Sequence, residues 1–170
     1  MKAEQETEKK RIEIGLYEKF AARAKDIMDE AKDKTSEAVE IAIEKAKEEM
    51  IEAGEFGRDQ GEKFKAFLER DTKIARENLV KVGQSAMEML NPGRVSAGVQ
   101  NALVSILDHL GEKFEDWSKK VESGLDYKAG ELTSPGTLVC KKCKNEIRMK
   151  VTGHVPVCPK CNATEFHKTY

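Results

Sequence analysis

Four cysteines, confined to the last 31 of 170 residues, constrain this chain more than any other feature. They form two pairs with two residues between the partners, Cys140 with Cys143 and Cys158 with Cys161. This spacing lets one tight turn aim both sulfurs at the same ion, and two such turns supply four tetrahedral ligands. The sequence therefore predicts one metal site with four thiolates, and zinc is the expected ion.

Iron and redox chemistry are the alternatives for these cysteines. Rubredoxin also binds iron through two such turns, but its turns usually place Gly after the second Cys, where this chain has Lys144 and Asn162. Its core is also rich in aromatic residues, and only Phe166 and Tyr170 occur here. Two redox-active pairs are less favoured, since the strand-to-helix setting of a thioredoxin motif is absent.

The residues around the cysteines predict a small β zinc ribbon over residues 138–170. Ile147, Met149 and Val151 alternate with polar residues, which is the period of a half-buried strand. Asn145 and Asn162 are expected near positions of positive φ, which Asn tolerates. Four thiolates leave no open position on the metal, so it is expected to stabilise the fold rather than activate water.

The remainder of the chain predicts a mainly α fold, with three to four long helices in a bundle or in hairpins. The chain is rich in Ala, Glu, Lys, Arg and Leu, as long helices are. Apolar residues repeat every three or four positions within residues 16–31, 39–51, 64–90 and 95–121. Breaks are expected at Thr35, Gly54–Gly57 and Asn91–Gly93, and Asp59 with Glu62 predicts a capping box. The predicted domains are a helical bundle or coiled-coil region at 1–125, a linker at 126–137 and the ribbon at 138–170.

The helical region favours an oligomer and disfavours a di-iron protein or another enzyme. The apolar stripes are narrow and contain many Ala and Met residues, so a homo-oligomer that shares its core is expected. The Glu-x-x-His pair of di-iron bundles is absent, because His109 is preceded three positions earlier by Ile106. No nucleotide-binding or hydrolase motif occurs, so neither an enzyme nor a small-molecule substrate is predicted.

Localisation follows from what the sequence lacks. No stretch approaches 18 consecutive apolar residues, and the N-terminus has no apolar segment typical of a signal peptide. The sequence therefore predicts a cytoplasmic protein without a membrane span. A membrane-surface helix over residues 11–31 is an alternative, weakened by the mixed charge of its polar face.

Charge is unevenly distributed between the two predicted parts. Residues 138–170 carry seven basic and two acidic side chains, a net charge of +5 before metal binding, and since the chain totals −1 the rest carries −6. A basic ribbon is a candidate surface for nucleic acid or for an acidic protein partner. The candidate contact residues are Lys141, Lys142, Lys144, Arg148, Lys150 and Lys160. His154 and His167 are expected at the ribbon surface.

Three segments of the ribbon region, 130–132, 136–143 and 158–166, resemble the C-terminal end of a bacterial zinc ribbon-containing protein family of unknown function. In the helical part, Ala53–Phe56 followed by Asp59, and Leu68–Asp71, are similar to the same family. The resemblance implies that the four cysteines are zinc ligands in a bacterial cytosolic protein, and it implies no activity. Asn162 departs from the family, which commonly has Gly there.

Three functions follow as hypotheses. The leading one is a non-enzymatic interaction or regulatory protein, in which helices oligomerise or bind a partner and the ribbon is a recognition tip. The second is a nucleic-acid-binding protein that uses the basic ribbon. The third is a rubredoxin-like iron electron carrier. If the two parts are independent, Cys140→Ser is expected to unfold the ribbon and leave the helices largely intact.

Overall fold

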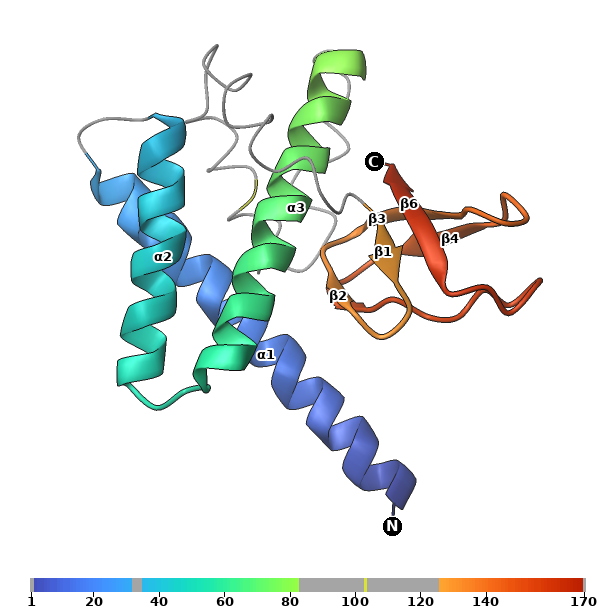
Figure 1. The fold of residues 1–170 in the computed structure, drawn as a ribbon, viewed down its shortest axis with the longest axis horizontal. Coiled ribbons are helices and arrows are strands. Elements are labelled where there is room, and N and C mark those ends of the chain that lie inside the picture. The colour runs from blue at the N-terminus through green and yellow to red at the C-terminus, as the bar shows by residue number, and fades with distance from the viewer. Residues whose placement is uncertain (1, 32–34, 83–102, 104–125, 170) are drawn as a thin grey trace.

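A computed structural model describes residues 2–31, 35–82, 103 and 126–169. These residues form α1 (Lys2–Glu30), α2 (Ser36–Glu52), α3 (Arg58–Val82), β1 (Tyr127–Lys128), β2 (Leu132–Thr133), β3 (Gly136–Cys140), β4 (Glu146–Met149), β5 (Gly153–His154) and β6 (Glu165–Thr169). The predicted class, helices followed by a small β unit, is confirmed. Figure 1 shows α3 between α2 and the strands, while α1 crosses both helices and continues past them to the N-terminus. No helix within these ranges has the length and apolar content needed to cross a bilayer.

The helix ends follow from local sequence. Thr35 caps α2, because its side-chain oxygen accepts a hydrogen bond from the Ala38 amide at 3.2 Å. Gly54 ends the same helix with a φ of 72°, a conformation that other residues adopt at a cost. α3 begins one residue before Asp59, which therefore lies in the first turn and not at the predicted cap position.

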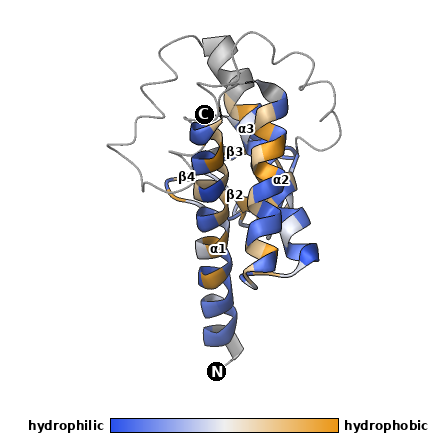
Figure 2. Ribbon diagram, turned by 90° about the vertical axis from the view of Figure 1, so that its left-hand side faces the viewer, coloured by the Kyte–Doolittle hydropathy of each residue, from blue (hydrophilic) through white to orange (hydrophobic). Residues whose placement is uncertain are grey.

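The helical core is built around four aromatic side chains. Tyr17, Phe20, Phe56 and Phe64 are buried, with ring centroids 5.3–6.3 Å apart in four pairs. Apolar positions lie between the helices, whereas the N-terminal turns of α1 are mostly hydrophilic (Figure 2). α2 and α3 approach closely at Gly61, where an added Cβ would lie 3.0 Å from Lys47 and Phe56.

The strands form two small antiparallel sheets. One has the order β1-β6-β3-β4, and β2 pairs with β5 in the other. The segment 126–137, predicted as a linker, contains β1, β2 and the start of β3. Two-residue strands are too short to show an alternating pattern, and burial of Tyr127 and Leu132 fixes them in place.

Part of the predicted helical region lies outside the described residues. This holds for the end of the third predicted helix, the break at Asn91–Gly93 and the fourth predicted helix at 95–121, apart from Leu103. Leu103 is fully buried and belongs to the helical core.

Candidate metal centre

Two turns of the same design carry the cysteines, and we call them knuckle 1 (residues 140–145) and knuckle 2 (residues 158–163). In knuckle 1 the Lys144 amide donates to the Cys140 carbonyl at 3.0 Å, and in knuckle 2 the Asn162 amide donates to the Cys158 carbonyl at 2.8 Å. Lys144 and Asn162 both have positive φ, 60° and 56°. The Asn162 prediction is confirmed, whereas the first knuckle uses Lys144 in place of the expected Asn145.

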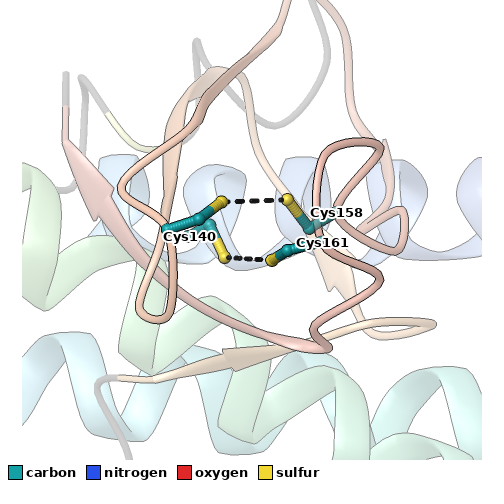
Figure 3. Close-up of side chains that lie close together, drawn as sticks. Cys140, Cys158 and Cys161 are labelled. Carbon is teal, nitrogen blue, oxygen red and sulfur yellow. Dashed lines mark hydrogen bonds between the residues drawn. The ribbon is translucent and has the colours of Figure 1, made fainter.

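The two knuckles bring their four sulfur atoms together. The Sγ atoms lie within 4.8 Å of one another, with 3.6 Å between Cys140 and Cys161 and between Cys143 and Cys158 (Figure 3). Disulfide bonding would need about 2.05 Å between the sulfurs. Tetrahedral Zn–S bonds of about 2.3 Å require sulfurs about 3.8 Å apart. The observed cluster therefore fits one four-coordinate ion of that size.

Backbone amides favour the thiolate form on the first cysteine of each knuckle. The amide of Cys143, with that of Lys142, lowers the pKa of Cys140 to about 6. Burial opposes ionisation of Cys158, but the amides of Lys160 and Cys161 bring the pKa of Cys158 below its ordinary value. The amide of Ala163 lowers the pKa of Cys161, yet the neighbouring thiols, Cys143 first, raise it to about 12. Four thiols this close cannot all ionise alone, so a cation is the natural partner of the cluster.

The metal centre has its own apolar surroundings. Buried Tyr127, Leu138, Val155 and Phe166 form one cluster with Cys140 and Cys158, and Ile147 and Met149 pack against it. The predicted alternation of Ile147 and Met149 is therefore confirmed, whereas Val151 is 53% exposed beyond the end of β4. The helix α3 also contributes Ile74, which is 1% exposed, to this cluster.

The predicted contact cations fall into two groups. Lys142, Lys144, Arg148, Lys150 and Lys160 are exposed. Within the described part of the chain none of these five makes an ion pair with a carboxylate. Lys141 differs, because its ammonium lies 2.6 Å from Asp126 and 4.0 Å from Glu165.

Lys168 was counted with the basic ribbon, but it does not belong to that surface. Its side chain is fully buried, and its Nζ lies 3.6 Å from Asp71 of α3. The ammonium also donates to Thr133 Oγ1 at 3.0 Å and to the carbonyl and hydroxyl oxygens of Ser134 at 2.9 and 2.5 Å. Burial lowers the pKa of Lys168 to about 8, although the Asp71 carboxylate acts in the opposite direction.

Asp71 is the centre of a buried polar junction between α3 and the ribbon. Besides Lys168, it accepts a hydrogen bond from the Tyr127 hydroxyl at 2.5 Å and one from the Ser134 amide at 2.7 Å. Two hydrogen-bond donors and one ammonium group, from three places on the ribbon, thus meet one carboxylate on a helix. Buried charges of this kind are stabilised only while every partner stays in place.

Arg70 makes the second half of this junction. Its guanidinium donates to Glu131 at 2.6 Å and to the carbonyl of Leu132 at 3.1 Å. It also stacks on the ring of Tyr127, with 3.8 Å from Cζ to the centroid. Sequence reasoning missed Arg70, Asp71 and Glu131 as functional residues, although all three lie in the segments 68–71 and 130–132 that carry the family resemblance.

His154 also differs from its prediction as a surface residue. Its ring Nε2 lies 3.0 Å from the Glu13 carboxylate of α1, and its side chain is only 14% exposed. His167 is exposed, as predicted. Within the described ranges, the contacts of the ribbon with the helical body include the one from His154 of β5 to α1 and the junction on α3.

Comparison with known families decides the classification. The family described as "Zinc-ribbon containing domain" matches residues 26–170, most of the chain. The chain belongs to this family. The match begins within α1, so both the helices and the ribbon are part of the shared domain.

Proteins in three strains of Escherichia coli are similar to this chain. The "Uncharacterized protein YbeL" of strain K12 is 22% identical over 133 residues, which cover 76% of this chain and 81% of that protein. The proteins of the same name in strains O6:H1 and O157:H7 match to the same extent. No solved structure matches this chain.

Proposed function

We propose that this chain is a non-enzymatic, zinc-binding interaction protein of the cytoplasm, in which a structural zinc ribbon serves as a recognition tip on a helical body. The observation that carries the proposal is the set of five exposed cations near the four-cysteine cluster, none of which forms an ion pair with a carboxylate of the described residues. The protein would hold Zn²⁺ with Cys140, Cys143, Cys158 and Cys161. The ion would stabilise the ribbon, since a unit of about 30 residues cannot bury enough apolar surface on its own.

Metal content tests the zinc assignment. Atomic spectroscopy of protein purified without added metal is expected to give one zinc per chain. The absorption spectrum is expected to show no band in the visible range. A coloured protein with stoichiometric iron would replace this assignment by the rubredoxin-like alternative. Iron is disfavoured by Lys144 and Asn162, which take the knuckle position where rubredoxin-like turns have Gly.

The absence of catalysis is part of the proposal. Four protein ligands leave the metal no open position for a substrate or a water molecule. A cavity of about 520 Å³ within the described residues is lined by apolar side chains, among them Ile27 of α1 and Ile41 of α2. Its polar groups include Glu30, Thr35 and Lys45, and neither an imidazole nor a thiol lies in its wall.

The cations are proposed to contact an anionic partner, either an acidic protein surface or nucleic acid. Unpaired surface charges attract opposite charge over about 10 Å, and such binding weakens as salt is added. Among the described residues of the ribbon, the Tyr and Phe rings, Tyr127 and Phe166, are buried and offer no exposed surface for stacking. Contacts with nucleic acid would therefore be to phosphates, without stacking on bases.

Fluorescence anisotropy with two labelled polyanions tests this surface, one a random-sequence DNA duplex and the other poly-glutamate. The tip variant carries Lys142→Gln, Lys144→Gln and Lys160→Gln. Its matched control carries Lys9→Gln, Lys45→Gln and Lys63→Gln, three exposed lysines of the helical body. Only the tip variant is expected to lose affinity, and the polyanion it stops binding identifies the partner class. Equal losses in both triple variants would contradict the proposal.

The helices are proposed to support the tip and to mediate self-association. Ile12 and Ile41 are 56% and 53% exposed, which leaves apolar positions available on α1 and α2. Light scattering of the zinc-loaded chain measures its mass directly. A dimer is expected to dissociate on Ile12→Lys or Ile41→Lys, and a monomer at all concentrations would remove this part of the proposal.

A further inference from the structure

The ribbon and the helical body exchange buried apolar side chains. Ile74 of α3 lies in the cluster that contains Cys140 and Cys158. In the other direction, Leu132 of β2 is 1% exposed and lies in the helical core with Phe64 and Leu68. Neither core is therefore complete without a side chain from the other part.

A short structural path connects the metal ligands to α3. Cys140 lies opposite Phe166 in the β3–β6 pairing, and Phe166 lies opposite Tyr127 in the β1–β6 pairing. Tyr127 donates its hydroxyl hydrogen to Asp71. Two residues beyond Phe166, on the same buried face of β6, Lys168 reaches Asp71 as well. The strands that surround the metal thus hold both side-chain partners of Asp71.

The junction is mostly polar, and this determines how it can open. Arg70, Asp71, Glu131 and Lys168 are charged, so water can solvate each of them once the two surfaces separate. Among the described residues, Ile74 and Leu132 are apolar side chains that cross the junction. Separation of the two surfaces would let each of the charged groups exchange its broken contact for water.

We propose that metal occupancy controls docking of the ribbon on α3, so that this protein is a metal-responsive conformational switch. With the ion bound, β3 and β6 hold Tyr127 and Lys168 against Asp71. Without it the ribbon loses its fold, its three polar groups leave Asp71, and a face of α3 that includes Arg70, Asp71 and Ile74 becomes accessible. The α1–α2 hairpin keeps its own core in both states. This proposal goes beyond the recognition function and does not depend on which partner the cations bind.

Hydrogen–deuterium exchange of the full chain tests the switch, with zinc bound and after removal of zinc by a chelator. Amides of α3 around residues 68–75 are expected to exchange at least about tenfold faster after chelation. Amides of α2 around Ile43–Met50 are expected to change little. The proposal is overturned if the α3 amides keep their protection while the ribbon amides lose theirs.

Reciprocity gives a second, independent measurement. If zinc favours docking, then weakening the docked state must weaken zinc binding by the same factor. Asp71→Asn removes the charge that faces Lys168, and Asp59→Asn is a matched control on the exposed first turn of the same helix. Competition with a chromophoric chelator is expected to show zinc affinity reduced about fivefold or more in Asp71→Asn and unchanged in Asp59→Asn.

A milder variant covers the case in which Asp71→Asn does not fold. Ser134→Ala removes only one hydroxyl acceptor of Lys168 and keeps the Ser134 amide that binds Asp71. It is expected to weaken zinc binding in the same direction by a smaller factor. Zinc affinity equal to that of Asp59→Asn in every folded junction variant would overturn the proposal.

Discussion

The two faces of α3 are built from different kinds of residue. Toward α1 and α2 the helix presents Phe64 and Leu68 to an apolar core, with ion pairs such as Lys65 to Glu44 at the edge. Toward the ribbon it presents Arg70 and Asp71, which are buried and bind ribbon groups through hydrogen bonds. The stability of the first interface depends on how much apolar surface is buried. The stability of the second depends on the positions of individual charged and hydrogen-bonding atoms.

This difference explains why one helix can serve two purposes. Apolar packing among α1, α2 and α3 involves many side chains, so the helical core keeps most of its contacts when the ribbon moves and only Leu132 is withdrawn from it. A buried charge becomes strongly destabilising when its partner moves away, so any change that displaces β1 or β6 weakens the contact between α3 and the ribbon. The metal centre lies on the responsive side.

Loss of the metal is expected to have the largest effect. Structural zinc sites have apparent binding energies of about 10–16 kcal/mol, which exceed the stability of most small domains. Cys140→Ser is expected to unfold the ribbon and, because Ile74 and Asp71 lose their partners, to reduce the helical signal in circular dichroism by part of the contribution of α3, from the turns around residues 68–75. Full retention of that signal would show that the helices fold independently of the ribbon.

Asp71→Ala tests the charged face. Removing this carboxylate leaves the buried ammonium of Lys168 without its anion, which is expected to lower the free energy of unfolding by about 3–5 kcal/mol. Urea denaturation of the zinc-loaded protein measures the change, with Asp59→Ala as the control. A loss below that of the control would show that the Lys168 ammonium is neutral or solvated by water.

Phe64→Ala tests the apolar face of the same helix. Phe64 contacts Tyr17, Phe20 and Phe56, so its removal leaves a cavity and is expected to lower the free energy of unfolding by about 3–5 kcal/mol. In contrast to Asp71→Ala, zinc affinity of the folded variant is expected to stay unchanged. Equal loss of zinc affinity in both variants would remove the distinction between the two faces.

The pH dependence of stability tests the contribution of Lys168 alone. Its pKa is about 8 in the folded protein and 10.5 in its ordinary state, so between these values the unfolded chain binds more protons. The free energy of unfolding is therefore expected to rise with pH from about 8 to 10.5. At lower pH the ammonium must be buried in its charged form, which opposes folding. Thermal unfolding from pH 8 to 10.5 is expected to show this rise in the native chain but not in Lys168→Met.

The smallest expected effect is at the exposed edge of the helical face. Arg23 donates to Glu49 across α1 and α2 at 2.6 Å, but both side chains are largely exposed. Arg23→Ala is therefore expected to change the free energy of unfolding by less than about 1 kcal/mol. A loss comparable to that of Phe64→Ala would mean that the α1–α2 interface depends on charge as strongly as the ribbon interface does.

The four-cysteine cluster could be predicted from the sequence because the spacing of neighbouring residues determines the geometry of each knuckle. Two residues between Cys140 and Cys143 determine where both sulfurs point, and no distant contact is needed. The junction was inaccessible to the same reasoning, since Arg70 and Glu131 are 61 positions apart and nothing local to either one indicates its partner. Lys168 is an example, because the sequence shows only that it adds to the positive charge of the ribbon, while the fold buries it.

The separation between the two halves of the junction also has a consequence for synthesis. A ribosome completes α3 long before it reaches residues 126–169, so Arg70 and Asp71 emerge with none of their ribbon partners available. The α1–α2–α3 contacts involve neighbouring segments and are expected to form early, whereas Tyr127 must find Asp71 from 56 positions away in the sequence and, under the proposed switch, only after the ribbon has acquired its ion. Maturation of the newly made chain would therefore wait on metal supply at its last step.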